Sequence, residues 1–204
     1  MIVDLTTLEP SQIYHLMTQA IVPRPIAWVL SDNGDDSVNL APFSYFNAIS
    51  SDPPLVMLSI GKKPNGERKD TRRNIAERSH SVIHIPKLED LDAVSASAAS
   101  LPHGESEVSL HNLPLTQESG WPLPRLQNAS IAMLTRCYSI EEIGPQKQGL
   151  IFCEIEKVYI DPELASQDAK GRLVIDPNKM QVLSRLGANS YAGLGDVIKQ
   201  SRPA

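Results

Sequence analysis

Apolar residues along this chain recur with two different periods, one typical of helices and one typical of strands. Between residues 9 and 20 they recur every three or four positions, and Pro10 suits a first helical turn, so we expect an amphipathic helix there. Short apolar or alternating runs predict strands. These runs cover residues 26–30, 38–43, 55–60, 81–85, 130–143 and 150–160.

Turn and cap signals join these elements. Asn33-Gly34 predicts a hairpin between the first two strands, and residues 144–149 predict a second hairpin between the last two. Asp70 or Thr71 is expected to cap a short helix that ends near Arg78. A further helix is expected around residues 88–98, and helix with loop in the tail from residue 176 to 204. Long antiparallel strands without strand–helix alternation favour a mainly β fold, a barrel or sandwich with peripheral helices.

Residues 101–128 interrupt this pattern with many prolines and glycines. An irregular stretch of this length in a compact domain usually covers a site or lies in an interface. We therefore interpret it as a functional insertion that apolar side chains anchor to the core. The expected anchors are Leu110, Leu113, Leu115, Trp121 and Leu123.

Composition narrows the class of protein. A length of 204 residues predicts one domain, residues 1–204, and a net charge of -5 disfavours binding to nucleic acid or to anionic membranes. No apolar run approaches the ~20 residues of a membrane helix, and the first ten residues lack a signal-peptide pattern, so we expect a cytoplasmic protein. The two cysteines, Cys137 and Cys153, lack C-x-x-C spacing and are expected to be buried thiols.

Charge reverses locally between residues 62 and 73, where six basic residues accompany two acidic ones. A helix is expected to begin at the end of this run, and helix starts bind phosphate through unpaired N–H groups and a partial positive charge. The run is therefore compatible with a phosphate site, in which Asp70 would cap the helix or orient Lys69. A solvated basic loop that balances acidic residues elsewhere explains the same charges.

Upstream of this loop, Ser44, Tyr45, Phe46 and Asn47 place hydroxyl, amide and aromatic groups next to each other. Such groups could line the polar edge of a flat ring, although an ordinary aromatic-rich strand has the same composition. The G-x-G-x-x-G and G-x-x-x-x-G-K-[ST] nucleotide motifs and the G-x-S-x-G motif of hydrolases do not occur. No closed four-ligand metal pattern is formed by His103, Glu105, Glu107 and His111, and a solvated loop is the preferred interpretation.

Three blocks, in order along the chain, resemble the flavin reductase-like family, and more narrowly its flavoredoxin and flavin-reductase-component branch. They read VPRPIAWVLSDNGDDSVNLAPFSYFNAISSDPPLVMLSIG, GERKDTRRNI and RLGANSYAGLG, and the resemblance extends from about Leu16 to Leu194. It implies an FMN-binding split β-barrel and a homodimer with FMN near the subunit interface.

The resemblance also assigns site residues. It implies FMN contacts from a ring-end group and a phosphate-end group, which are Ser44, Tyr45, Phe46, Asn47, Ser59, Gly61 and Lys62, and Lys69, Asp70 and Thr71. Arg185, Gly187 and Tyr191 match the family's C-terminal signature, for which we expect a role in packing or in the interface. His84 departs from the family, many of whose members have Asn at this position.

These features predict an NAD(P)H-dependent flavin reductase, in which NADH or NADPH passes electrons through FMN to a second flavin, to oxygen, or to a monooxygenase or other redox partner. Because the cofactor carries the chemistry, no catalytic residue is assigned. A flavin-binding electron carrier that does not oxidise NAD(P)H fits the same site, and a cofactor-free barrel with a role in assembly is a third alternative. Selectivity for the nicotinamide or for a protein substrate is expected in the segment from Leu101 to Gly120.

Overall fold

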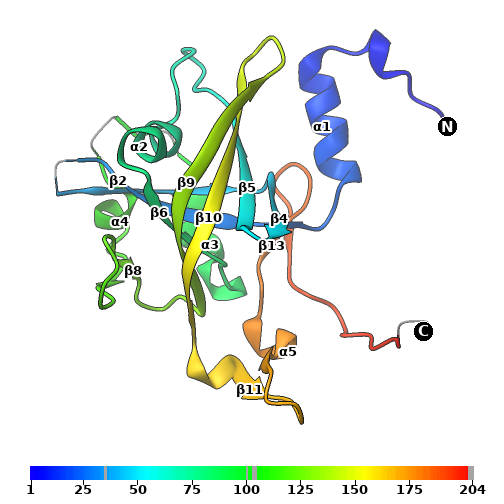
Figure 1. Ribbon diagram of the computed structural model, residues 1–204. Coiled ribbons are helices and arrows are strands. Elements are labelled where there is room, and N and C mark those ends of the chain that lie inside the picture. Colours follow the sequence, from blue (N-terminus) through cyan, green and yellow to red (C-terminus); the bar gives the residue numbers. More distant parts are fainter. Residues whose placement is uncertain (35, 100, 103–104, 202–204) are drawn as a thin grey trace.

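A seven-stranded antiparallel sheet forms the centre of the protein, in the strand order β3-β2-β6-β9-β10-β5-β4 (Figure 1). The computed structural model describes residues 1–34, 36–99, 101–102 and 105–201. The sheet strands are β2 (Ala27–Asp32), β3 (Val38–Phe43), β4 (Phe46–Ser51), β5 (Pro54–Ile60), β6 (His80–His84), β9 (Ile131–Ile143) and β10 (Gln148–Ile160). The predicted mainly β fold is confirmed. The sheet is open, because β3 and β4 form its two edges although they are consecutive in sequence.

Both predicted hairpins are present. β2 pairs with β3, and β9 pairs with β10 over almost their whole lengths. Asp35, in the first predicted turn, lies outside the described residues. The long β9–β10 hairpin rises through the middle of the molecule in yellow-green and yellow (Figure 1).

In the described part of the chain, five short helices lie around the sheet, and three 3₁₀ turns accompany them. The helices are α1 (Pro10–Ala20), α2 (Asp70–Arg78), α3 (Leu91–Ala96), α4 (Glu107–Leu110) and α5 (Pro177–Met180); the turns are η1 (Leu5–Thr7), η2 (Leu88–Asp90) and η3 (Pro162–Leu164). The helix predicted at residues 9–20 is confirmed as α1. The cap predicted for α2 is wrong. Lys69 occupies the N-cap without a side-chain capping bond, and Asp70 is the first helical residue. The Asp70 carboxylate forms an ion pair with Lys63.

The tail was expected to be helix and loop, and most of its described residues are α5 (Pro177–Met180) or loop. The expectation missed two short strands. A strand of two residues is too short to show an alternating pattern in the sequence. One three-stranded sheet joins β1 (Arg24–Pro25), β13 (Ser184–Arg185) and β14 (Tyr191–Ala192). Before the tail, two further small hairpins join β11 (Ala165–Gln167) to β12 (Leu173–Ile175), and β7 (Leu115–Thr116) to β8 (Arg125–Leu126).

Two apolar clusters cover opposite faces of the sheet. Alternate residues of β2 belong to different clusters, with Trp28 in one and Val29 in the other. The first cluster includes Val94 of α3 and Val108 of α4, so helices and the insertion cover that face. The second contains Ile75 of α2 among residues of β3, β5 and β10. This double burial explains why β2 reads as a continuous apolar run.

The insertion between residues 101 and 128 belongs to the first cluster. Trp121 and Leu123 are buried in it, and Leu113 and Leu115 pack against it, as predicted. Leu110 was expected to be an anchor but is 60% exposed, because the single turn of α4 directs Val108 inward instead. The Ser106 hydroxyl donates to the Val38 carbonyl, 2.5 Å away, and the Glu107 carboxylate accepts from the Leu40 amide, 2.9 Å away. The insertion thus covers part of the free edge of β3.

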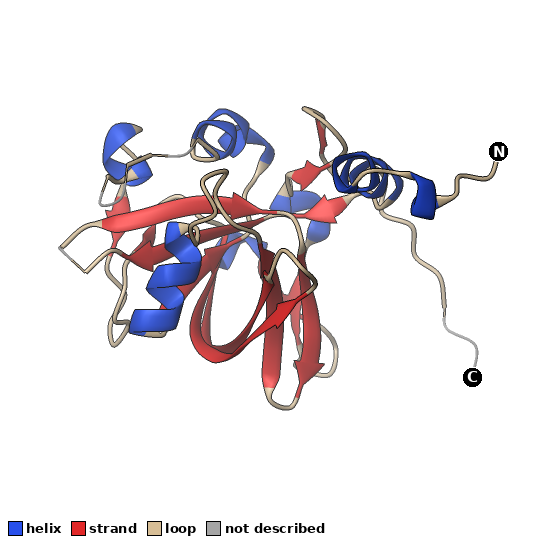
Figure 2. Ribbon diagram, turned by 90° about the horizontal axis from the view of Figure 1, so that it is seen from above, coloured by secondary structure: helices blue, strands red, loops and turns tan. Residues whose placement is uncertain are grey.

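Helix α1 lies beside the sheet, on the same side of the molecule as both chain ends (Figures 1 and 2). Only Thr18 of this helix is buried. Gly187 allows close approach of α1, since a Cβ there would overlap the Gln19 side chain. The structure therefore gives Gly187 the packing role expected for the C-terminal signature. The predicted apolar face of α1 remains largely uncovered in the single chain.

Candidate functional site

A cavity of about 110 Å³ lies where the start of α2 meets β3 and the insertion. Lys69, Asp70 and Thr71 reach it from the helix start, Asn39 and Phe43 from β3, and Glu107 from α4. Three residues of the predicted phosphate end thus come together in one concave site. Sequence analysis did not identify the contribution of β3 or of Glu107.

A network of side-chain amides fixes the start of α2 against the β2–β3 hairpin. The Asn39 amide donates to the Thr71 hydroxyl at 2.8 Å, and Asn74 donates to Ser31 at 3.2 Å and to Asn33 at 2.9 Å. Thr71 and Asn74 are buried. These contacts tie the helix to the hairpin and hold its first turn in a fixed position beside the cavity.

Lys69 is the basic residue of the 62–73 loop that is available at this cavity. Its ammonium lies 5.6 Å from the centroid of the Phe43 ring and has no hydrogen-bond or ion-pair partner among the described residues. The side chain remains partly open to solvent, but its surroundings desolvate the charged group and lower the pKa of Lys69. An anion in the cavity would reverse that shift.

Most other basic side chains of the loop are already paired. Lys63 binds the Asp70 carboxylate at 2.6 Å and Arg73 lies 3.6 Å from it, while Arg68 and the buried Arg72 both contact Glu142. Asp70 therefore orients Lys63 and Arg73, and the interpretation that it orients Lys69 is wrong. Lys62 has no ion-pair partner among the described residues either, but it does not line the cavity.

The predicted ring end lies next to this cavity without lining it. Ser44 and Tyr45 connect β3 to β4, and the Tyr45 carbonyl accepts from the Ser59 amide at 2.8 Å. Phe46 packs against the second apolar cluster, the one that contains Ile75. Asn47 is exposed, and its side chain accepts a hydrogen bond from the Ala48 amide. Burial raises the pKa of Tyr45, whose ring lies 6.2 Å from that of Tyr14 in α1.

Two polar residues outside the predicted set support the ring end. The Gln148 amide donates to the Ser59 hydroxyl at 3.0 Å, and its side chain covers Gly61, where a Cβ would come within 3.2 Å of it. The buried Arg24 guanidinium donates to Ser44 at 3.4 Å and to the Ile21 and Leu186 carbonyls at 2.7 Å each. The sequence feature that could have indicated this supporting role is Arg24 itself, which lies between two prolines in VPRPIAWV.

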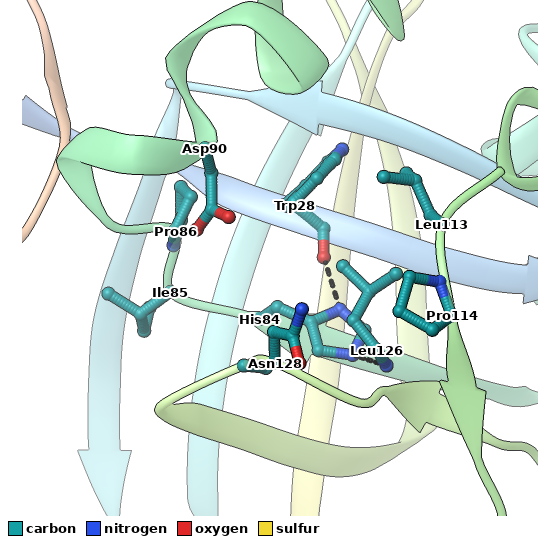
Figure 3. A pocket seen from close by; sticks show the side chains of 10 residues that line it. Trp28, His84, Ile85, Pro86, Asp90, Leu113, Pro114, Leu126 and Asn128 are labelled. Carbon is teal, nitrogen blue, oxygen red and sulfur yellow. Dashed lines mark hydrogen bonds between the residues drawn. The ribbon is translucent and has the colours of Figure 1, made fainter. Parts of the chain in front are cut away.

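A second, smaller cavity of about 50 Å³ lies away from this site, between β6 and the insertion (Figure 3). His84 is buried in its wall, with Nδ1 2.9 Å from the Trp28 carbonyl and Nε2 accepting from the Leu126 amide at 3.0 Å (Figure 3). Burial lowers the pKa of His84 to about 4. His84 therefore connects the sheet to the insertion as a neutral ring.

The part of the chain that the structure describes shows neither a metal site nor a membrane-spanning helix. There, no three His, Cys, Asp or Glu side chains are arranged to hold a metal ion. His103 lies outside that part, and Glu107 bonds to the Leu40 amide. No helix among the described residues has the length and apolar character needed to cross a membrane.

Comparison with known proteins identifies similar chains. Nitrilotriacetate monooxygenase component B from Bacillus cereus is 30% identical, with a TM-score of 0.89 over 98% of each chain. The 2-nitrobenzoate 2-nitroreductase NbaA of Pseudomonas fluorescens is 29% identical, with a TM-score of 0.87 over 100% of this chain and 96% of that one.

A Shewanella frigidimarina protein with a split barrel domain is 18% identical, with a TM-score of 0.83 over 98% of this chain and 96% of that one. This likeness confirms the split-barrel fold that the open sheet suggests. Residues 18–183 match the model of the flavin reductase like domain. The chain therefore belongs to the flavin reductase-like family.

Proposed function

We propose that this protein binds FMN and acts as an NAD(P)H-dependent flavin reductase. Family membership supports flavin oxidoreductase chemistry. The observation that carries the FMN site is the Lys69 ammonium at the cavity beside the start of α2, which has no ionic partner among the residues that the structure describes. When bound, FMN would supply the chemistry by accepting hydride from NADH or NADPH and passing electrons to free flavin or a partner. The similarity to a monooxygenase component B favours an oxygenase as that partner.

The residues present fit such a cofactor. Lys69 and the first-turn N–H groups of α2 would hold the phosphate, with Thr71 kept in place by Asn39. Ser44, Tyr45 and Asn47, together with Ser59, Gly61 and Lys62, would contact the ring. Phe46, which packs inward, would shape the wall behind it. Arg24 and Gln148 would keep Ser44 and Ser59 in position.

The phosphate site is tested by Lys69→Met, which removes the charge and retains most of the stem. We expect the dissociation constant of FMN to rise ten- to about a hundredfold, since one charge-assisted hydrogen bond contributes ~1.5–3 kcal/mol. The double variant with Thr71→Ala should bind more weakly still. Fluorescence titration of the apoprotein with FMN measures the affinity.

Lys170→Met is the matched control, because it removes one charge from an exposed lysine outside the site. Equal FMN affinity of the Lys69→Met variant, the Lys170→Met variant and the unmodified protein would place the phosphate elsewhere.

The use of NAD(P)H is tested on the FMN-loaded protein under anaerobic conditions. We expect NADH or NADPH to bleach the long-wavelength absorbance of bound flavin, because hydride transfer reduces the ring. Dithionite serves as the control that shows the flavin to be reducible. Bleaching by dithionite but by neither nicotinamide would support a flavin-binding electron carrier instead.

A further inference from the structure

The two cysteines of the chain lie opposite each other in neighbouring strands. Cys137 belongs to β9 and Cys153 to β10, and the two are direct partners in the antiparallel register. They are separated by fifteen residues in sequence, so their spacing alone indicates no pairing. Both are free thiols in the structure.

The backbone hydrogen bonds identify the geometry of this pair. The Cys137 amide donates to the Ser79 carbonyl at 2.9 Å, on the side of β9 that faces away from β10. Cys137 and Cys153 therefore occupy a non-hydrogen-bonded position, where side chains of neighbouring strands lie closest and a regular ladder has Cα atoms about 4.5 Å apart. The register shifts between Phe152 and Cys153, so the pair lies beside a β-bulge. Disulfides accept Cα separations from about 4.4 Å upward, so the strands already have a suitable spacing.

The side chains point to the same face of the sheet. Cys153 is fully buried in the second apolar cluster, and Cys137 packs against that cluster while remaining partly exposed. Their pairing across the two strands places the two side chains next to each other. Burial raises the pKa of both thiols, to about 12 for Cys153, where the Cys137 thiol adds to the effect. A small oxidant can reach Cys137, and Cys153 is its immediate neighbour.

We propose that Cys137 and Cys153 form a reversible, redox-active cross-strand disulfide, with a peroxide as the oxidant. The Cys137 thiol loses its proton and the thiolate attacks the peroxide. The O–O bond breaks, the leaving hydroxide takes up the proton, and a sulfenic acid and one water form. The Cys153 sulfur then attacks the sulfenic sulfur, which forms the S–S bond and releases a second water. In total the two thiols lose two electrons and two protons, and hydrogen peroxide is reduced to two waters.

Oxidation would covalently join β9 to β10, the strand that pairs with β5 and carries Gln148 to Ser59. The modification would therefore lie in the sheet that supports the proposed ring end. Its chemistry depends only on the two thiols and the oxidant, so it stands whether or not the protein binds FMN.

The test is intact-mass spectrometry of the full chain, reduced with dithiothreitol, desalted and then exposed to hydrogen peroxide. We expect a mass lower by two hydrogen atoms, no uptake of iodoacetamide after denaturation, and a Cys137–Cys153 linked peptide after digestion. Dithiothreitol should restore both thiols. Continued alkylation of both cysteines, or only sulfinic acid or intermolecular disulfide, would overturn the proposal.

Cys137→Ala and Cys153→Ala are the matched controls, and each should abolish the loss of two hydrogens. The measurement on the unmodified chain does not depend on how well these variants fold. Circular dichroism of the oxidised chain gives a second criterion, since a pair already in position should close with the native spectrum retained. Loss of the native spectrum on oxidation would show that closure requires unfolding, and would contradict the proposed geometry.

Discussion

His84 illustrates at the scale of one residue how tertiary contacts determine protonation. Its Nε2 accepts from the Leu126 amide, so Nδ1 carries the proton and donates to the Trp28 carbonyl. Protonation of Nε2 would remove the first bond and place a charge in a fully buried position. The ring thus stays neutral for two reasons. Burial disfavours the charged form, and Nε2 must remain unprotonated to accept the hydrogen bond from the Leu126 amide.

This arrangement predicts a loss of stability in mild acid. The folded-state pKa of His84 is about 4, below the ordinary value of 6.5, so the unfolded chain binds the proton more readily between these values. The contribution of His84 is complete above pH 6.5 and is lost as pH falls to 4. We expect the free energy of unfolding to fall by about 3 kcal/mol from this group. Urea unfolding from pH 7 to pH 4 measures it.

His84→Asn provides the comparison, because it removes the titrating ring and should flatten the pH dependence over this range. Should the variant fold poorly, an NMR titration of His84 in the unmodified protein answers the same question. A folded-state pKa near 6.5 would contradict the prediction.

At the scale of elements, Arg24 connects three segments that are distant in sequence. Its buried guanidinium donates to the Thr18 and Ile21 carbonyls at the end of α1, to Leu186 in the tail and to Ser44 after β3. The carbonyl end of a helix carries a partial negative charge, which compensates for part of the buried cation. Arg24 thus sets the position of α1 and of the proposed ring end together.

Arg24→Met should therefore destabilise the protein and loosen the site. We expect the free energy of unfolding to fall by at least ~3 kcal/mol, since several carbonyls lose a charged donor in a buried position. The Arg136→Met variant is the control, because Arg136 is half exposed and its pairs with Glu154 and Glu156 are worth below about 1 kcal/mol. Urea unfolding compares the two variants. Equal losses would show that Arg24 has no special structural role.

At the scale of the whole molecule, the described residues of the single chain leave much of the apolar face of α1 exposed. Tyr14 and Met17 of α1 and the following Ile21 are between 40% and 61% exposed. This face lies on the side of the molecule that carries both chain ends and near Tyr45 of the proposed site (Figure 1). We propose that a second copy of the chain covers it, as the family resemblance implies.

Light scattering after size exclusion should give a mass near twice the 22.4 kDa of one chain. Met17→Asp should shift the protein toward the monomer, because dimerisation would bury the new charge without a partner. Leu110→Asp is the control, since Leu110 is also exposed but lies in α4, on the other side of the sheet from α1 (Figure 1). A monomeric unmodified protein would contradict the prediction.

The sequence by itself determined six of the seven strands of the central sheet, with β4 as the exception, and both hairpins, α1 and α2. Each of these depends on local periodicity or on turn residues such as Asn33-Gly34. It also located the basic loop, and its motif blocks identified the family. Charge counting could not separate Lys69 from its neighbours, however. Only the fold shows that Arg68 and Arg72 form ion pairs with Glu142, and that Lys63 and Arg73 form ion pairs with Asp70.

The tertiary structure alone decided which distant residues meet. The contribution of β3 and Glu107 to the cavity, the support of Ser44 by Arg24 and the pairing of Cys137 with Cys153 all depend on strand order and register. Such contacts join residues that are far apart in sequence and leave no local pattern, so periodicity cannot reveal them. The short strands of the tail escaped prediction for the same reason, because each is held by its partner strand and not by its own composition.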